Sequence, residues 1–357
     1  MIIKPLAFYL PQYHPIPEND EWWGEGFTEW TNVRKAKPLY TGHYQPLISE
    51  ELGYYDLRNP EVMEKQIQLA KEYGVYGFIF YHYWFGNGKQ LLEKIPEEML
   101  KSGSPDFPFC FCWANETWSG VWHGLQNKIL VKQEYGGEED IKKHVEYLAP
   151  FFRDERYIKV DGAPVLMVYD PTYLQELGRE YLELYRKHAK IQGFSDIFFI
   201  GSSKSPDDIS YKDLGYNAHV SNAFHKSFNQ QVRNWKYKWS FFSKLIGSRR
   251  GPARISAKYL FDSVKIKEAD VETYPMVLPN WDNTPRSNKR GVVLEGATPE
   301  IFESELLKAK KYLNSNGKDY KEKFLIIKSW NEWAEGNILE PEARYGNQFL
   351  QKIKDAL

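Results

Sequence analysis

Eight short apolar runs, most of them separated by stretches with helical spacing, restrict the fold of this chain more than any other feature. The runs are continuous and rich in β-branched and aromatic residues, which is typical of strands buried on both faces of a parallel sheet. They are PLAFYLPQ from Pro5, GVYGFIFYHYW from Gly74, FPFCFCWANE from Phe107, PVLMVYD from Pro164, DIFFIGS from Asp196, YNAHVS from Tyr216, YPMVLPNWD from Tyr274 and FLIIKSWNEW from Phe324.

Helical patterns lie between several of these runs. The segment NPEVMEKQIQLAKEYG has Pro60 near its start and Gly74 just past its end, the usual punctuation of a helix. GGEEDIKKHVEYLAPFF, YLQELGREYLELYRKHAKIQG and TPEIFESELLKAKKYL have the same spacing. Strand alternating with helix eight times predicts a (β/α)8 TIM barrel with long loop insertions, rather than a doubly wound sheet. We expect residues 1–357 to form this single barrel domain, although the sixth run is weak.

Two segments are too long for simple connections. Residues 14–57 lack clear periodicity, and a loop of this length in a compact domain is usually functional, so we expect it to contact substrate. Residues 225–261 carry several lysines and arginines, including the adjacent Arg249 and Arg250. This basic insertion suits contact with an anionic glycan or with a membrane surface, and it equally suits a solvated loop.

Composition excludes some classes of protein. A net charge of −1 argues against nucleic-acid binding through overall charge. An aromatic content of 16% suits sugar rings or protein interfaces. Cys110 and Cys112 are too close along one strand for a disulfide and are predicted to be buried free thiols. No signal peptide or membrane span is recognisable, which predicts a cytoplasmic protein; the oligomeric state is left open.

Polar and aromatic residues gather at the predicted carboxyl ends of the strands, where (β/α)8 barrels carry their active sites. Acids and amides can bind hydroxyl groups while aromatic rings cover C–H faces, so this mixture predicts sugar binding. Several positions also have structural interpretations: His82 as a core histidine, Glu116 in an ion pair, and Asp170 as a turn residue at a helix start. The candidate substrate-binding residues are Gln12, His14, His82, Tyr83, Trp84, Trp113, Asn115, Glu116, Trp281 and Asn331.

The candidate catalytic residues are Glu332 and Glu335, in the segment SWNEWAEGNILEP after the eighth run. Cleavage of a glycosidic bond requires one group that protonates the leaving oxygen and a second carboxylate that acts as base or nucleophile. Two carboxyls packed against aromatic rings and each other would have their pKa values pushed apart, which supplies both forms near neutral pH. The alternative is that both glutamates merely begin a helix, where the dipole favours acids.

Other chemistries lack their sequence signals. GxSxG, HExxH, CxxC and phosphate-binding loop motifs are absent, and the histidines do not have metal-ligand spacing. We therefore expect neither a metal nor a cofactor. An acidic D-x-D motif, typical of nucleotide-sugar transferases, is also missing, since Asp282 stands alone in NWDN.

Three longer motifs resemble a known family. AFYLPQYHPIPENDEWWGEGFTEWTNV, WANETW and SWNEWAEGNILEP together resemble the WbsX-type proteins, a branch allied to glycoside hydrolase family 99. The resemblance spans Ala7 to Pro341 and implies a (β/α)8 barrel. It further implies an enzyme that acts on α-linked, mannose-like sugars with retention of anomeric configuration. Members of the branch are often labelled glycosyltransferases and are associated with clusters for surface polysaccharide or O-antigen.

The resemblance assigns roles to the glutamate pair. Glu332 would be the base that activates the 2-hydroxyl of the substrate, which attacks C1, and Glu335 would be the acid/base. The endomannosidases commonly have histidine where this chain has Ala334, and their N-terminal loops differ, so the resemblance supports the reaction more strongly than the sugar. Two alternatives stay open: a glycosyltransferase-type enzyme of lipopolysaccharide, O-antigen or capsule biosynthesis, and a non-catalytic glycan-binding barrel.

Overall fold

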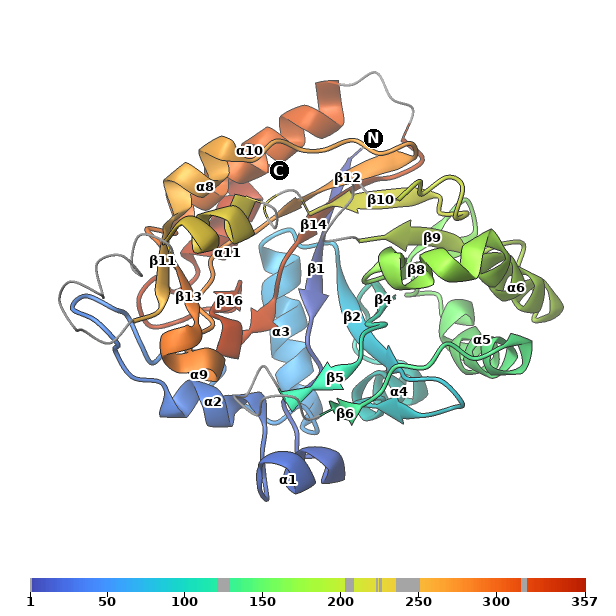
Figure 1. Cartoon of the computed structure of the whole chain (residues 1–357), viewed down its shortest axis with the longest axis horizontal. Helices are drawn as coiled ribbons and strands as arrows, with labels where there is room; N and C mark the ends of the chain where they lie inside the picture. The colour runs from blue at the N-terminus through green and yellow to red at the C-terminus, as the bar shows by residue number, and fades with distance from the viewer. Residues whose placement is uncertain are drawn as a thin grey trace.

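Eight parallel strands close into a barrel in the computed structural model (Figure 1). The structure describes residues 2–120, 129–202, 209–222, 224, 227–235, 251–315 and 320–357. The order around the barrel is β1-β14-β12-β10-β9-β8-β4-β2, and β2 pairs with β1 to close it. All eight apolar runs form these strands, so the predicted barrel is confirmed. The strands are β1 (Ile3–Tyr9), β2 (Gly77–Trp84), β4 (Phe109–Trp113), β8 (Ala163–Val168), β9 (Phe198–Gly201), β10 (Ala218–Ser221), β12 (Glu272–Val277) and β14 (Lys323–Ile327).

Amphipathic helices surround the barrel and bury their apolar faces on it. The four predicted helical segments correspond to α3 (Pro60–Glu72), α5 (Glu138–Arg153), α6 (Gly178–Ile191) and α10 (Pro299–Ser315). The third segment differs in its first turn, because η2 (Pro171–Leu177) is a 3-10 helix that Asp170 caps by accepting from the Thr172 N–H. This confirms the structural interpretation of Asp170. Further helices of the layer are α4 (Lys94–Ser102), α8 (Ala257–Ser263) and α11 (Gln348–Ala356).

Short elements decorate the barrel. β3 (Gln90–Leu91) pairs with the end of β2 in antiparallel orientation, and β7 (Lys159–Val160) pairs with β8 in the same way. Three two-stranded sheets are formed by β5 (Trp118–Ser119) with β6 (Ile129–Val131), β11 (Ala253–Ser256) with β13 (Val292–Glu295), and β15 (Asn331–Glu332) with β16 (Asn337–Ile338). Between the last two strands lies the 3-10 turn η5 (Trp333–Glu335), and α9 (Thr284–Ser287) and η4 (Asn288–Arg290) precede β13.

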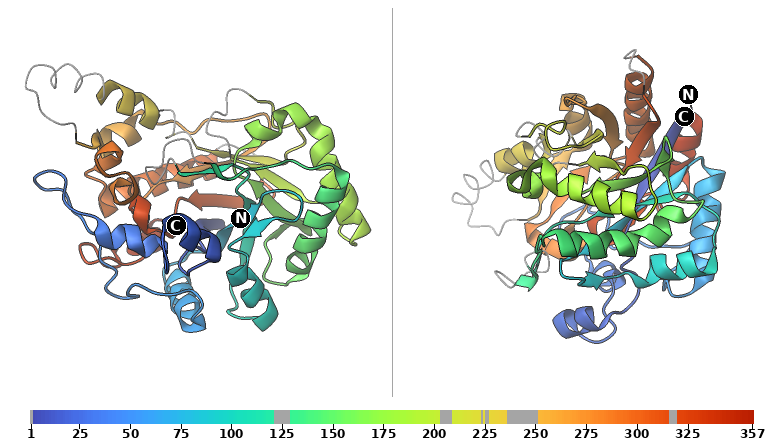
Figure 2. Two further views of the ribbon diagram at one scale, coloured as in Figure 1. Left: turned by 60° about the horizontal axis from the view of Figure 1, so that its bottom comes forward. Right: turned by 90° about the vertical axis from the view of Figure 1, so that its right-hand side faces the viewer.

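The long segment 14–57 contains two short helices, α1 (Pro17–Trp23) and α2 (Glu29–Lys35), on the side toward which the β1 arrow points (Figure 1). Both chain termini lie on the opposite side of the molecule (Figure 2). Trp30 of α2 packs on Tyr13 and Trp333, with ring centroids 4.8 and 5.3 Å apart. The segment therefore covers the end of the barrel that carries Glu332 and Glu335.

The interior is one large apolar cluster that reaches from Leu6 to Ala356, with a smaller cluster around Leu260, Leu278 and Leu294. Cys110 and Cys112 are buried and unpaired, as predicted. Of the basic insertion, residues 227–235 and 251–261 are described. The basic residues on which its binding prediction rests, Arg249 and Arg250 among them, lie outside the described residues.

Candidate active site

The segment that follows β14 is fixed to β1 by polar contacts from both sides. The side chain of Asn331 accepts from the Leu10 N–H at 2.8 Å and donates to the Leu10 carbonyl at 3.0 Å. The Tyr13 hydroxyl donates to the Asn331 carbonyl and accepts from the Trp333 N–H. These contacts set the path of the backbone on both sides of Glu332.

A second anchor for this segment is the buried carboxylate of Glu340. It accepts hydrogen bonds from the indole N–H groups of Trp330 and Trp333, the Gln66 amide and the Tyr55 hydroxyl. Burial raises its pKa to about 7, although the four donors act in the opposite direction. Because Trp333 lies between the two candidate catalytic glutamates, Glu340 helps to set their relative placement.

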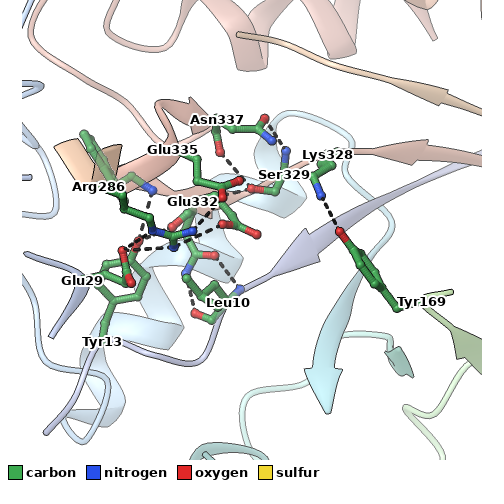
Figure 3. A network of polar contacts seen from close by, with 12 residues as sticks. Leu10, Tyr13, Glu29, Tyr169, Arg286, Lys328, Ser329, Glu332, Glu335 and Asn337 are labelled. Carbon is green, nitrogen blue, oxygen red and sulfur yellow. Dashed lines mark hydrogen bonds and ion pairs between the residues drawn. The ribbon is translucent and has the colours of Figure 1, made fainter. Parts of the chain in front are cut away.

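One guanidinium group connects three carboxylates at the barrel mouth (Figure 3). Arg286 of α9 donates to Glu335 Oε1 at 2.7 Å, and its Nη2 lies 3.6 Å from Glu332 Oε2. It also contacts Glu29 of α2 at 3.1 Å. Burial alone would lower the pKa of Arg286, but the three carboxylates raise it, so the cation is retained.

The electrostatics of the site disfavour a second negative charge beside Glu335. Burial, followed by the charge of Glu335, raises the pKa of Glu332 to about 7, and the two cations Arg286 and Lys328 oppose this shift. Burial likewise raises the pKa of Glu29, against the attraction of Arg286. A raised pKa brings the proton equilibrium of Glu332 closer to neutral pH, which suits a group that must take and return a proton.

Both glutamates line a cleft with a volume of about 610 Å³. Its walls come from segments far apart in the sequence: α1 and α2, the ends of β2 and β14, the β5 turn and α9. Among the candidate residues, the cleft brings together Gln12, Tyr83, Glu116, Trp281, Glu332 and Glu335. The long segment 14–57 contributes Asn19, Trp22, Trp23 and Glu29.

Three aromatic candidates face the helical layer instead of the cleft, which corrects their expected orientation. His82 Nε2 lies 2.8 Å from His144 Nε2 of α5, and Trp84 stacks on the same histidine with ring centroids 4.4 Å apart. Trp113 donates to the Trp84 carbonyl and meets His144 edge-on. Burial lowers the pKa of His82 to about 3, so this histidine is neutral and belongs to the core.

The two asparagine candidates join strand ends to one another. Asn115 donates to the Asp170 carbonyl and accepts from the Asp170 N–H, both at 2.9 Å. Asn331 makes the equivalent pair of bonds with Leu10, so neither amide is directed to the cleft. His14 is buried and does not line the cleft either, and burial lowers its pKa. These three positions are corrected from cleft-lining residues to residues that shape the barrel mouth.

Sequence reasoning missed several cleft residues. Arg286 sits in a polar segment and Glu29 in the long N-terminal loop, and only their spatial meeting reveals them. Lys328 at the end of β14 lies 3.5 Å from the Tyr169 hydroxyl, and both line the cleft (Figure 3). The spacing of Lys328 just before SWNEW, at a strand end, was a usable signal. No comparable signal marks Asn19.

Within the part of the chain that the structure describes, no group of three or more His, Cys, Asp or Glu residues could hold a metal ion. Over the same residues, no helix combines the length and apolar character needed to cross a membrane.

The fold and the site define a (β/α)8-barrel protein with a carboxylate pair in an aromatic-lined cleft at its carboxyl edge. Residues 5–353 match the family described as Glycosyltransferase WbsX, and the chain belongs to this family. Two relatives from Xanthomonas campestris pv. campestris, both described as uncharacterized protein WxcX, are 35% identical over 365 residues (strain B100) and 36% identical over 356 residues (strain ATCC 33913). Each alignment covers 99% of this chain and 49% of the relative, so the chain spans about half of their length.

Solved structures share the fold at low sequence identity. The GH99 endo-alpha-mannosidase from Bacteroides thetaiotaomicron in complex with bis-tris-propane superposes with a TM-score of 0.54 and 15% identity, covering 99% of this chain and 95% of that one. A structure described as a glycoside hydrolase-like protein has a TM-score of 0.56 at 14% identity, covering 99% and 93%. At these identities the likeness shows the barrel fold alone.

Proposed function

We propose that this chain is the catalytic barrel of a retaining glycoside hydrolase that acts on an α-linked, mannose-like polysaccharide or oligosaccharide. The single observation that supports this most strongly is the pair Glu332 and Glu335, which line one cleft and share the guanidinium of Arg286. Membership of the WbsX family and the barrel shared with endo-alpha-mannosidases agree with a glycan as substrate. Surface-polysaccharide metabolism in the cytoplasm is part of the same proposal.

The proposed reaction has two balanced steps. In the first, Glu332 takes the proton of the substrate 2-hydroxyl while O2 attacks C1; the C1–oxygen bond to the leaving sugar breaks, and Glu335 gives that oxygen its proton. In the second, the Glu335 carboxylate takes a proton from water, which opens the 1,2-anhydro sugar at C1, and Glu332 returns its proton to O2. Two inversions at C1 give net retention.

Arg286 constrains this scheme. In the substrate-free arrangement it donates to Glu335, whereas the first step needs a protonated Glu335 that donates to the leaving oxygen. The two are compatible if the bound sugar separates the guanidinium from Glu335 and leaves it on Glu29, its other close partner at 3.1 Å.

The test compares Glu332→Gln and Glu335→Gln on α-linked mannose oligosaccharides, with NMR used to read the anomer first released. We expect both variants to lose at least a thousand-fold in kcat/KM, and an aryl mannoside with a good leaving group to restore turnover in the Glu335 variant only. Glu61→Gln, an exposed position on α3, is the control. Inversion at C1, or a wild-type level of turnover in the Glu332 variant, would refute the mechanism.

A second candidate function is glycosyl transfer, favoured by the description of the family. The same anhydro sugar would be opened by an acceptor hydroxyl instead of water, with Glu335 again taking the proton. Product analysis with and without an added acceptor saccharide separates the two functions, and tight binding of a nucleotide sugar in calorimetry would count against the hydrolase. If the wild-type protein binds the oligosaccharides but turns none over, the chain is a glycan-binding barrel.

A further inference from the structure

Asn19 of α1 is one of the residues that line the active-site cleft, and its amide group has no hydrogen-bond partner in the part of the chain that the structure describes. The residue is 0% exposed. Neither its Oδ1 nor its Nδ2 has a hydrogen-bond partner among the described residues. The great majority of buried side-chain polar atoms in proteins do have a partner, because a buried group without one has lost its hydration and gained nothing. An amide left in this state on the wall of a cleft calls for a partner that arrives with the ligand.

The surroundings of Asn19 indicate the chemistry of that ligand. Trp22, three residues further along α1 and therefore on the same face, also lines the cleft and is half-buried. Across from it stands Trp118 of β5, with the two ring centroids 6.1 Å apart in an edge-on arrangement. An amide that can both donate and accept, beside apolar ring faces, suits a pyranose: hydroxyls for the amide and C–H groups for the rings.

The aromatic wall continues from α1 toward the barrel. Trp118 contacts the ring of Tyr83 at 4.9 Å, and Tyr83 also lines the cleft. Tyr83 lies at the carboxyl end of β2, where burial raises the pKa of its hydroxyl and the nearby charge of Glu332 adds to this shift. The cleft thus has one end at the carboxylates and another at α1. A sugar at Glu332 and Glu335 would leave room in the same cleft for a neighbouring unit at α1.

We propose that Asn19, with Trp22 and Trp118, forms a separate sugar subsite that binds a pyranose unit away from the cleaved bond through paired hydroxyl contacts to the amide. This rests on the proposed function, since it assigns the substrate more than the two sugars that flank the bond. Asn19 is then a specificity residue, and the binding free energy gained at α1 favours oligosaccharides over disaccharides.

The substitution Asn19→Leu separates this role from a structural one. Leucine has the same number and branching of side-chain heavy atoms and no polar atoms, so it removes a buried amide without removing any hydrogen bond that the described residues make to it. We expect the melting temperature of Asn19→Leu to equal or exceed that of the wild type.

We further expect the KM of Asn19→Leu for α-linked mannotetraose to rise about tenfold, while its kcat/KM for α-linked mannobiose stays within twofold of the wild-type value. Trp22→Ala should show the same length-dependent loss. Glu21→Ala, exposed on the same helix, is the matched control and should change neither parameter.

Each outcome decides the proposal. A melting temperature that falls by several degrees in Asn19→Leu, with equal losses on both substrates, would show that the amide has a structural partner and would overturn the subsite. Unchanged kinetics on both substrates would overturn it as well. If the wild type cleaves neither oligosaccharide, affinity of Glu332→Gln for the two saccharides is measured by calorimetry instead: failure to bind either sinks the proposed function. If Glu332→Gln and the double variant Glu332→Gln/Asn19→Leu bind the tetrasaccharide with equal affinity, the subsite is refuted while the proposed function stands.

Discussion

Arg286 donates to Glu335 at 2.7 Å and stands at 3.6 Å from Glu332, so one cation holds the two glutamates unequally. Glu335 carries the close ion pair, whereas the pKa of Glu332 is raised to about 7 mainly by burial and by the charge of Glu335. Burial and the charge of Glu335 therefore raise the pKa of Glu332, while the guanidinium that contacts both carboxyls lowers it in part.

Removal of this cation should move the pH profile. In Arg286→Met the pKa of Glu332 loses one of its two lowering influences and rises further, so less of the base form is present at neutral pH. We expect the acidic limb of kcat/KM to move up by about one pH unit or more, with roughly a tenfold loss at pH 7. Arg286→Lys keeps the positive charge but lacks the planar guanidinium, so its acidic limb should lie between those of the wild type and Arg286→Met. Arg290→Met, exposed on η4, is the control; an unshifted limb in Arg286→Met would contradict the role.

Glu332 should cost stability in return for activity. A free glutamate has a pKa of about 4.3, and burial raises that of Glu332 to about 7, so the folded chain binds a proton that the unfolded chain releases between these values. Stability contributed by this group is present below about pH 4 and is lost as the pH rises through 7. Glu332→Gln should therefore be more stable than the wild type at pH 8, by on the order of 1–3 kcal/mol, and about equal to it at pH 4. Urea unfolding at both pH values measures the difference; a variant that is less stable at pH 8 would show that ionised Glu332 is favoured by the fold.

The barrel itself could be predicted from sequence because buried parallel strands are continuous apolar runs, and all eight runs became strands. The direction in which each side chain points at the end of a strand is harder to predict from the sequence. On β2, Tyr83 lines the cleft while its neighbours His82 and Trp84 pack on α5. The alternation follows from strand geometry, but its phase depends on helix packing, which a single sequence does not show.

Contacts between segments far apart in the chain could not be predicted from the sequence, because no local pattern marks them. Arg286 and Glu29 are 257 positions apart, and neither sits in a pattern that marks an ion pair. The catalytic candidates were accessible because their spacing of three residues after a predicted strand is local. Asn331 was correctly placed at the barrel mouth, but its side chain joins Leu10 instead of the cleft, since the loop after β14 needs that bond to hold its path.

Loss of the Glu340 carboxylate should impair catalysis and stability together. Glu340→Leu would leave the indole N–H groups of Trp330 and Trp333 buried without an acceptor, and each such group costs roughly 1–3 kcal/mol. We expect a lower melting temperature and a fall in kcat of at least tenfold with little change in KM, because Trp333 lies between the catalytic candidates. Differential scanning calorimetry and steady-state kinetics measure both, with Glu64→Gln on the exposed face of α3 as the control. A stable variant with normal kcat would show that Trp333 keeps its place without this acceptor.

Gly336 provides the closest test of how tightly the catalytic turn is packed. It has a φ of +54°, and a Cβ at this position would lie 2.9 Å from the backbone N and O of Asp282, whose N–H donates to the Glu335 carbonyl at 2.7 Å. Gly336→Ala must therefore push η5 away from Asp282 and shift Glu335. Gly346 has a similar φ of +52° but nothing within 4 Å of its Cβ position, so Gly346→Ala carries the same backbone strain without the clash. We expect both variants to lose roughly 1–2 kcal/mol of stability from strain, but only Gly336→Ala to lose tenfold or more in kcat. Equal kcat values in the two variants would mean that Glu335 tolerates movement of its turn.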